Sequence, residues 1–299
     1  MMKNLKYLIL PIATGLVLSS CGGDDNKDEI DNGVDSTKTE NVDSNNPVSE
    51  TFFQVPSPGE MLTFIKMVGG KNNKNTTFLN PPENQKNYTD AKGKALNFGI
   101  YSCDLSYCSI FDIGAEALKY FKSVKQLGDQ IGVSSTIKPE IMKRLEGNVG
   151  NSDSLAVITD DVYFSSFETL ENGQQGTTLA LVVAGGWIES LFIATNLAKY
   201  EANSPIIERL ADQKYTLENL IEFLKKHEAD TNVAGVKADF EGLLAEFNKI
   251  EQKDVTTNTK DDKGKKMLGG GKQLVVSEAL YKAITDKIKT IRNSYTLTK

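Results

Sequence analysis

The feature that most constrains the fold is a long apolar segment, TLALVVAGGWIESLFIATNLA, within residues 177–200. As a helix it is apolar on nearly every face, which is typical of a helix buried at the centre of a protein. Gly185 and Gly186 in its middle each cost about 1 kcal/mol of helix stability relative to alanine. We therefore expect a central helix here, with another helix packed closely against the glycine pair.

Helical patterns also flank this segment on both sides. The spacing of apolar residues predicts helices over 90–111, 113–131, 139–148, 152–171, 205–212, 216–226, 233–252 and 277–294. A further helix start is predicted at Ser57-Pro58-Gly59-Glu60, where Ser57 is an N-cap, Pro58 takes the first helical position and Glu60 closes a capping box. That helix is expected to end at Gly69-Gly70.

The remaining segments of the body are expected to be loops. Residues 71–88 are rich in Asn and Pro, and residues 256–276 are polar and rich in Gly, with 273–276 as a short extended segment at most. No run of alternating strands is present. The sequence therefore predicts an all-α fold, a single multi-helix bundle of about eight to ten helices.

The N-terminus has the pattern of a secretory signal. Lys3 and Lys6 precede a mostly apolar stretch of about eleven residues. This stretch is too short to span the hydrocarbon core of a membrane, which requires a helix of roughly 20 residues. Leu-Ser-Ser-Cys at 18–21 resembles the bacterial lipobox, and this resemblance implies that Cys21 becomes the first residue of the mature chain and carries acyl groups. The alternative is an ordinary signal peptide with a chance cysteine.

The segment after Cys21 is strongly acidic. Residues 22–50 contain nine acidic residues against two lysines and no aromatic residue. Such a composition cannot bury enough apolar surface to fold, so a disordered tether is expected. We therefore expect a signal peptide at 1–20, a lipidated cysteine and linker at 21–50, and a helical domain at 51–299.

The tether also bears on localisation. Gly22-Gly23-Asp24-Asp25 resembles the acidic tract that follows the lipidated cysteine in surface-exposed lipoproteins of Bacteroidota. This resemblance favours the cell surface over the periplasmic face of the outer membrane. The remaining body is nearly neutral, which argues against a nucleic-acid partner, because such a partner requires a basic face.

Motifs for catalysis or metal binding are missing from the sequence. The single histidine, His227, stands at an expected helix end, where a cation interacts favourably with the helix dipole. No Cys/His ligand set, calcium loop, nucleophile elbow or phosphate loop is found, so no metal or cofactor is expected. Cys103 and Cys108 are interpreted as small buried residues, because a spacing of five in one helix places them on different faces; a disulfide between them is the less favoured alternative.

Two carboxylates in apolar helices are the main candidate site. Asp104 and Glu189, the latter close to Trp187, are interpreted as a buried ion pair, a ligand contact or catalytic acids. The chain has only three arginines, and Arg144 is predicted to pair with Asp104 or Glu189. Arg144→Ala is accordingly expected to destabilise the fold by about 3–5 kcal/mol.

Aromatic residues recur along the central helices and are interpreted first as core, or else as the lining of a groove for a sugar or an apolar segment. They are Tyr101, Tyr107, Phe111, Tyr163, Phe164, Phe167 and Trp187.

Three segments, GIYSCDLSYCSIFD (99–112), NVGNSDSL (148–155) and AGGWIESLFIATNLA (184–198), resemble a family of Bacteroidota outer-membrane lipoproteins without an assigned function. The resemblance covers most of residues 52–294 and implies no catalytic residue. We expect a non-enzymatic, lipid-anchored interaction or scaffold protein, or an accessory subunit of an outer-membrane protein. The alternatives are a glycan- or peptide-binding lipoprotein and, more remotely, a carboxylate-based hydrolase.

Overall fold

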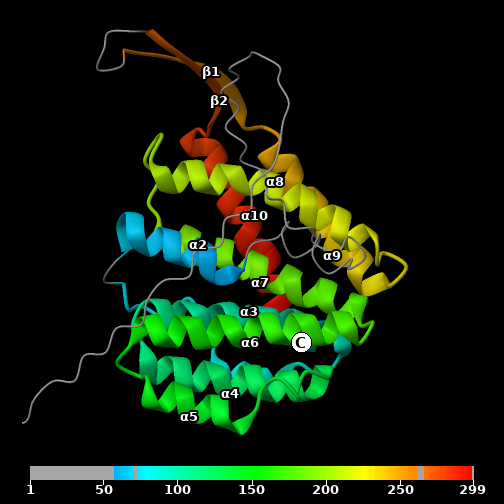
Figure 1. Ribbon diagram of the computed structural model, residues 1–299. Helices are drawn as coiled ribbons and strands as arrows, with labels where there is room; N and C mark the ends of the chain where they lie inside the picture. Colours follow the sequence, from blue (N-terminus) through cyan, green and yellow to red (C-terminus); the bar gives the residue numbers. More distant parts are fainter. Residues whose placement is uncertain (1–56, 71–72, 261–265, 298–299) are drawn as a thin grey trace, which may run out of the picture. The chain divides into compact units, whose positions relative to one another are not determined.

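The computed structural model describes residues 57–70, 73–260 and 266–297, so the predictions for Cys21 and residues 1–50 lie outside this part of the chain. It confirms an all-α multi-helix fold (Figure 1). All of the described elements belong to a single compact unit. In chain order they are α2 (Pro58–Ile65), η1 (Lys66–Gly70), η2 (Pro82–Asn87), α3 (Ala91–Ile110), α4 (Gly114–Ile131), α5 (Pro139–Gly147), α6 (Ser152–Asn172), α7 (Gly176–Leu197), α8 (Pro205–Lys225), α9 (Thr231–Phe247), β1 (Glu251–Lys260), β2 (Lys266–Val275) and α10 (Glu278–Thr296).

Helices α3 and α7 form the centre of the fold and pack along each other. Glycines allow this close approach: a Cβ atom added to Gly99 of α3 would overlap the carbonyl oxygen of Val182, and one added to Gly185 would overlap that of Leu96. The expected close packing at the glycine pair of α7 is therefore confirmed. Its reason is contact between the two helix backbones.

The other helices cover this central pair. Helices α4 and α6 pack on α3, and α5 packs on α4 and α6, while α9 and α10 pack on the other side against α7 (Figure 1). Helix α8 packs mainly on α9, and α2 lies against both α3 and α7. The central pair is thus enclosed, and Phe98, Tyr101 and Ile188 have no exposed surface.

Helix α7 is long and apolar enough to cross a membrane by length and composition alone, and it is the only such helix among the described residues. In the fold 89% of its most apolar 18-residue window is buried by protein. Helix α7 is therefore the buried core helix that its sequence predicts.

Residues 256–276 differ from the prediction of a loop. Strands β1 and β2 form a two-stranded antiparallel hairpin, in register from Glu251 opposite Val275 to Lys260 opposite Lys266. β-branched residues at 255–257 favour this extended backbone. The opposite strand contains the glycine run 269–271, which weakens any strand signal and made the segment resemble a loop.

Two helix predictions need correction as well. Residues 205–225 form one helix, α8, and not two. The helix continues through Thr216, and its buried Gln213 accepts a hydrogen bond from the Trp187 indole. At the start of α2, Pro58 takes the first helical position as expected. The capping box is not formed, because the Ser57 side chain makes no cap hydrogen bond and only its carbonyl accepts from the Glu60 amide.

Candidate functional site: a buried ionic cluster

Glu189 and Arg292 form a buried bidentate ion pair between α7 and α10. The Arg292 Nε donates to Glu189 Oε2 at 2.7 Å, and Nη2 donates to Oε1 at 2.9 Å. Glu189 has no exposed surface, and the Arg292 side chain is 8% exposed. Two parallel charge-assisted bonds in a dry interior make this the strongest geometry for an arginine and a carboxylate.

The prediction that Arg144 is the partner of these acids is wrong. Arg144 lies in the last turn of α5, and within the described part of the chain it pairs only with Asp161 of α6, at 3.7 Å. Both side chains are more than half exposed. Arg144 therefore belongs to the surface.

The second acid, Asp104 of α3, has no exposed surface, and no described lysine or arginine forms a salt bridge with it. Its Oδ2 accepts from the Asn80 amide at 3.3 Å, while Oδ1 has no donor. Burial raises its pKa well above the usual range, and the neighbouring Glu189 carboxylate raises it further, although Arg292 lowers it. These surroundings favour the protonated form of Asp104, whose side chain is hydrogen-bonded to Glu189. Asp104, Glu189 and Arg292 are called the buried ionic cluster below.

Neutral hydrogen bonds extend the buried ionic cluster to the chain segment before α3. The Asn80 side-chain amide donates to the Tyr88 hydroxyl at 2.9 Å and to the side-chain oxygen Oδ1 of Asn97 at 3.1 Å. The Tyr88 hydroxyl donates in turn to the main-chain carbonyl of Thr296, the last residue of α10. This network ties residues 80–88 and the end of α10 to α3.

Trp187 is buried but takes no part in the buried ionic cluster. Its indole N–H donates to Gln213 of α8 at 3.2 Å, and its ring packs edge-on against Phe240 of α9, with 5.3 Å between ring centroids. The ring is 3% exposed, so it cannot stack on a ligand in this conformation. Trp187 therefore joins α7 to α8 and α9 as a core residue.

The other aromatic candidates are core residues too. Six of the seven are buried and Phe164 is half-buried; the buried ones are Tyr101, Tyr107, Phe111, Tyr163, Phe167 and Trp187. The core interpretation is thus confirmed, and these side chains do not form an exposed groove.

The histidine and the two described cysteines have structural surroundings. His227 follows the end of α8 and packs edge-on against Phe223, with its ring next to Gly176 at the start of α7. Burial and then Lys226 lower the pKa of His227, which favours the neutral imidazole over the helix-terminal cation that the sequence suggested. Cys103 and Cys108 are buried and free, as predicted. No group of side chains suited to a metal ion occurs in the described segments.

The chemistry open to the buried ionic cluster is limited by its closure. A hydrolase needs carboxylates that reach a substrate, whereas Asp104 and Glu189 have no exposed surface and Glu189 is held by two bonds to Arg292. The Arg292 guanidinium neutralises the Glu189 carboxylate, and the raised pKa of Asp104 favours its neutral form. The cluster is therefore suited to fixing α3, α7 and α10 relative to one another.

Sequence reasoning missed Arg292, although a signal was present. Arg292 lies four residues after Ile288 and eight after Ile284, so it falls on the buried stripe of its own helix. The roles of Asn80 and Asn97 had no such signal, because they depend on how residues 73–88 fold back on α3.

The chain was compared with protein-family models, curated proteins and solved structures, and none of them matches it.

Proposed function

We propose that this chain is a non-enzymatic interaction or scaffold protein of the outer membrane, held there by acyl groups on Cys21. The observation that carries the non-enzymatic part is the closure of the buried ionic cluster: both candidate acids lack exposed surface. The lipobox-like Leu-Ser-Ser-Cys supports the anchor. The acidic segment 22–50 supports a tether that keeps the helical body away from the membrane.

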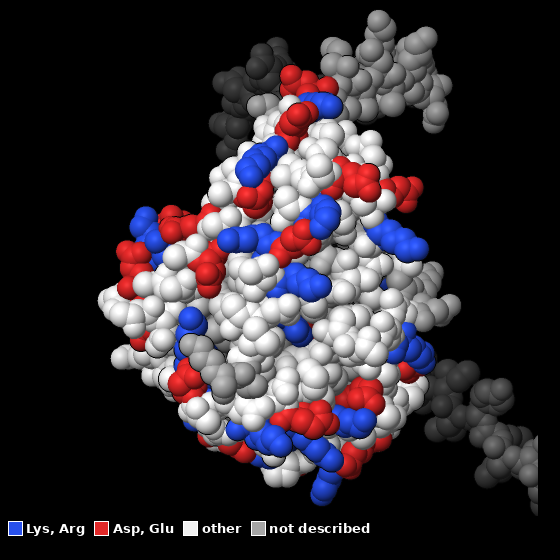
Figure 2. Space-filling view, turned by 180° about the vertical axis from the view of Figure 1, so that it is seen from behind, with Lys and Arg blue, Asp and Glu red and all other residues white. Residues whose placement is uncertain are grey.

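The charged surface fits a protein partner better than a nucleic acid. Figure 2 shows one face of the molecule on which acidic and basic side chains are interspersed, with no large area of a single sign. Binding to nucleic acid requires a continuous basic face. An accessory subunit of an outer-membrane protein is the form of this role that we favour.

A specific observation supports a second candidate, a glycan- or peptide-binding module. An open pocket of about 420 Å³ lies between the start of α3, helix α9 and the end of α10. Asp90, Lys92 and Asp239 supply polar groups to it, and the Asp239 carboxylate accepts from the Tyr295 hydroxyl at 2.9 Å. This candidate is second because the Tyr88 and Tyr295 rings of the pocket are less than 10% exposed and offer no open stacking surface.

The anchor is tested by metabolic labelling of the full chain with an alkyne analogue of palmitate, followed by membrane fractionation. We expect label and membrane association in the wild type and in Cys108→Ala, a control at a buried cysteine, and loss of both in Cys21→Ser. Equal labelling of Cys21→Ser would contradict lipidation at this position.

The interaction role is tested by crosslinking in cells, then purification of the tagged lipoprotein and mass spectrometry. We expect one stoichiometric membrane protein in the wild type that is absent when Cys21→Ser is used. If no stoichiometric partner is found, the second candidate gains support and glycan and peptide arrays become the next step. Hydrolysis of a glycoside or peptide substrate by the purified chain would overturn the non-enzymatic proposal.

A further inference from the structure

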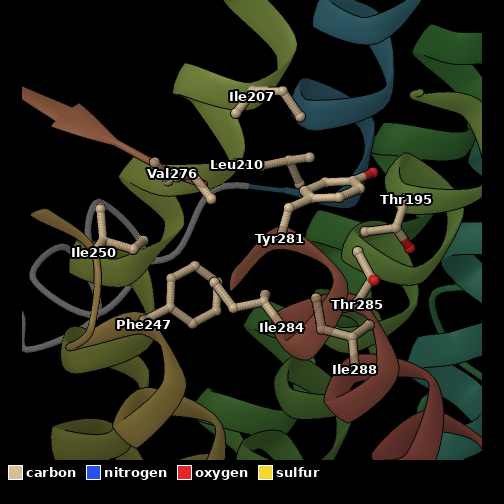
Figure 3. Close-up of a pocket in the computed structure, with 11 residues that line it drawn as sticks. Thr195, Ile207, Leu210, Phe247, Ile250, Val276, Tyr281, Ile284, Thr285 and Ile288 are labelled. Carbon is tan, nitrogen blue, oxygen red and sulfur yellow. The ribbon is translucent and has the colours of Figure 1, made fainter. Parts of the chain in front are cut away.

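Two of the pockets in the described fold differ in what they can hold. The apolar pocket at the base of the hairpin, between α7, α8, α9 and α10, has a volume of only about 10 Å³, room for about one water molecule (Figure 3). Side chains such as Phe247 and Ile284 close around it, so it is a small gap in the packing. The open pocket between the start of α3, helix α9 and the end of α10 has about 420 Å³, within the range of about 300–1,000 Å³ for small-ligand sites. We call it the α3–α10 pocket.

Two half-buried side chains of opposite charge line the α3–α10 pocket from different helices, Lys92 from α3 and Asp239 from α9. Tyr295 of α10 contacts both of them. The Lys92 Nζ lies 5.8 Å from the centroid of its ring, and its hydroxyl donates to Asp239 Oδ2 at 2.9 Å. Within the described segments, neither charge takes part in a salt bridge. A cation and an anion therefore line one pocket without neutralising each other.

Buried hydrogen bonds hold the walls of the α3–α10 pocket in place. The Asn97 side-chain amide donates to the main-chain carbonyls of Gly93 and Tyr295, both at 2.9 Å. The Tyr88 hydroxyl donates to the Thr296 carbonyl at 3.1 Å. These bonds join the start of α3, the end of α10 and the segment before α3, which all line the pocket. The walls are therefore fixed before any ligand arrives, which reduces the entropy lost on binding.

The lining of the α3–α10 pocket favours a ligand with two charges over a sugar. The rings of Tyr88 and Tyr295 are less than 10% exposed, so a sugar ring has no open aromatic face to stack on. Asp90, the other acid of the lining, caps α3 by accepting from the Gly93 amide at 2.8 Å. A ligand with a single charge would leave either Lys92 or Asp239 without a partner, whereas a ligand with an ammonium and a carboxylate pairs with both.

We propose that the α3–α10 pocket binds a zwitterion, with its carboxylate at Lys92 and its ammonium at Asp239. The two charged groups belong to a free α-amino acid or to the two ends of a short peptide. Each end then makes a charge-assisted hydrogen bond, the stronger class of such bonds. This assignment rests on the second candidate function, the binding module, and names its class of ligand.

The first test is calorimetric titration of the full chain, purified in detergent, with the common amino acids, the matching Gly-Xaa-Gly tripeptides and maltotriose. We expect saturable one-to-one binding of an amino acid or a tripeptide, and the tighter of the two identifies the source of the zwitterion. Acetylation of its amine and amidation of its carboxylate should each weaken binding about fivefold, as for the loss of one ion pair.

The outcomes separate this proposal from the binding-module function on which it rests. Saturable binding of maltotriose without binding of any zwitterion would overturn the proposal and retain the binding module. If none of the probes binds, both fail. If the blocked and unblocked forms bind equally well, the proposal fails, because the charges then contribute nothing.

Two variants assign the charged ends of the ligand. Lys92→Gln should weaken binding of the unblocked probe about fivefold and leave binding of its amidated form unchanged. Asp239→Asn should weaken binding of the unblocked probe equally and leave binding of the acetylated form unchanged. The asparagine oxygen can still accept from the Tyr295 hydroxyl, so the packing contact is retained. An equal loss for blocked and unblocked forms would contradict the assignment of that end.

Matched controls on the same helices separate the pocket from the net charge of the chain. Lys94→Gln on α3 and Glu246→Gln on α9 remove the same charges from half-buried residues that do not line the α3–α10 pocket. We expect both to bind the unblocked probe as the wild type does, with melting curves that show folded protein. A loss in these controls as large as in Lys92→Gln and Asp239→Asn would overturn the proposal.

Discussion

Two arginine–carboxylate contacts in this protein differ in their surroundings and in their geometry. Arg292 and Glu189 meet in the core through two bonds of 2.7 and 2.9 Å, while Arg144 and Asp161 meet at the surface through one contact of 3.7 Å. In the core, water cannot replace a lost partner, so a broken pair leaves a charge uncompensated. At the surface, water hydrates either charge alone, so the pair adds little. Residue type alone therefore does not give the contribution of such a pair.

The largest effect is expected from Arg292→Ala. The change leaves the Glu189 carboxylate buried without a cation and removes the contact with the Phe192 ring, so the free energy of unfolding should fall by about 3–5 kcal/mol. Urea unfolding followed by circular dichroism measures it. A fall below about 1 kcal/mol, the value for an exposed pair, would break the comparison.

A double variant separates charge from packing in that result. Arg292→Ala combined with Glu189→Gln removes both members of the pair, so the buried charge no longer exists. We expect the double variant to be more stable than Arg292→Ala alone. If both have the same stability, the loss comes from packing and not from the charge.

Asp104→Asn tests whether the Asp104 carboxyl keeps its proton in the folded state. Burial and then Glu189 raise the pKa of Asp104, so the folded state keeps a proton that the unfolded chain releases above about pH 4. The wild type should therefore lose up to about 1.4 kcal/mol of stability per pH unit through this group as pH rises, until the raised pKa is reached. Asparagine has no such dependence, so the gain from Asp104→Asn should grow with pH and vanish near about pH 4.

The measurement is urea unfolding of both proteins at several pH values, because their difference removes the contributions of all other groups. Stability curves that run parallel with pH would show that Asp104 is ionised in the folded state.

Asp160→Asn extends the comparison to two adjacent residues of α6. Asp160 is half-buried against Gly59 at the start of α2, and burial, then Glu60 and Asp161, raise its pKa to about 6. Because the folded pKa lies above the unfolded value, Asp160 lowers the stability of the folded state as pH rises from about 4 to about 6, and the loss is complete above about pH 6. Asp160→Asn should therefore stabilise by about 2–3 kcal/mol near neutral pH, and the gain should disappear below about pH 4.

The neighbouring acid is the matched control for that change. Asp161→Asn alters an exposed side chain in the same helix, so we expect a change of less than about 1 kcal/mol at any pH. A similar stabilisation by both variants would point to the net charge of α6 and not to the burial of Asp160.

The fold was largely predictable from the sequence because helical periodicity is local. The central place of α7 follows from its own residues, and the glycine pair indicated the neighbour that α3 supplies. The hairpin was not predictable in this way, since its strands depend on pairing with each other and on contacts of β2 with α8, and β2 contains Gly269–Gly271. The sequence prediction ended one helix before Thr216 and began another there. The continuous helix α8 is supported by tertiary contacts, such as that of Gln213 with Trp187, which the local sequence does not indicate.

The candidate site was predicted in part. The acids Asp104 and Glu189 lie in apolar helices, which indicated their burial. To identify the arginine that pairs with Glu189, one must know which face of each arginine-bearing helix is covered by other helices. Arg292 shares a face with the buried Ile284 and Ile288, whereas Arg144 lies beside the buried Leu145 on a face that stays exposed. Adjacent positions on a helix point in directions about 100° apart, so nearness in sequence to an apolar residue does not indicate burial.

The smallest effect is expected from Arg144→Ala, which the sequence alone predicted to be severe. The Arg144 and Asp161 side chains are 53% and 59% exposed, so the pair should contribute about 0.5 kcal/mol, and Arg144 should add a similar small term at the end of α5. Both terms are electrostatic between exposed groups, so the effect should disappear in about 1 M salt, whereas the loss in Arg292→Ala should persist. The two variants, unfolded in urea at low and high salt, measure this directly. A salt-independent loss of several kcal/mol in Arg144→Ala would mean that this surface pair is as important for stability as the buried one, and that exposure does not determine the difference between them.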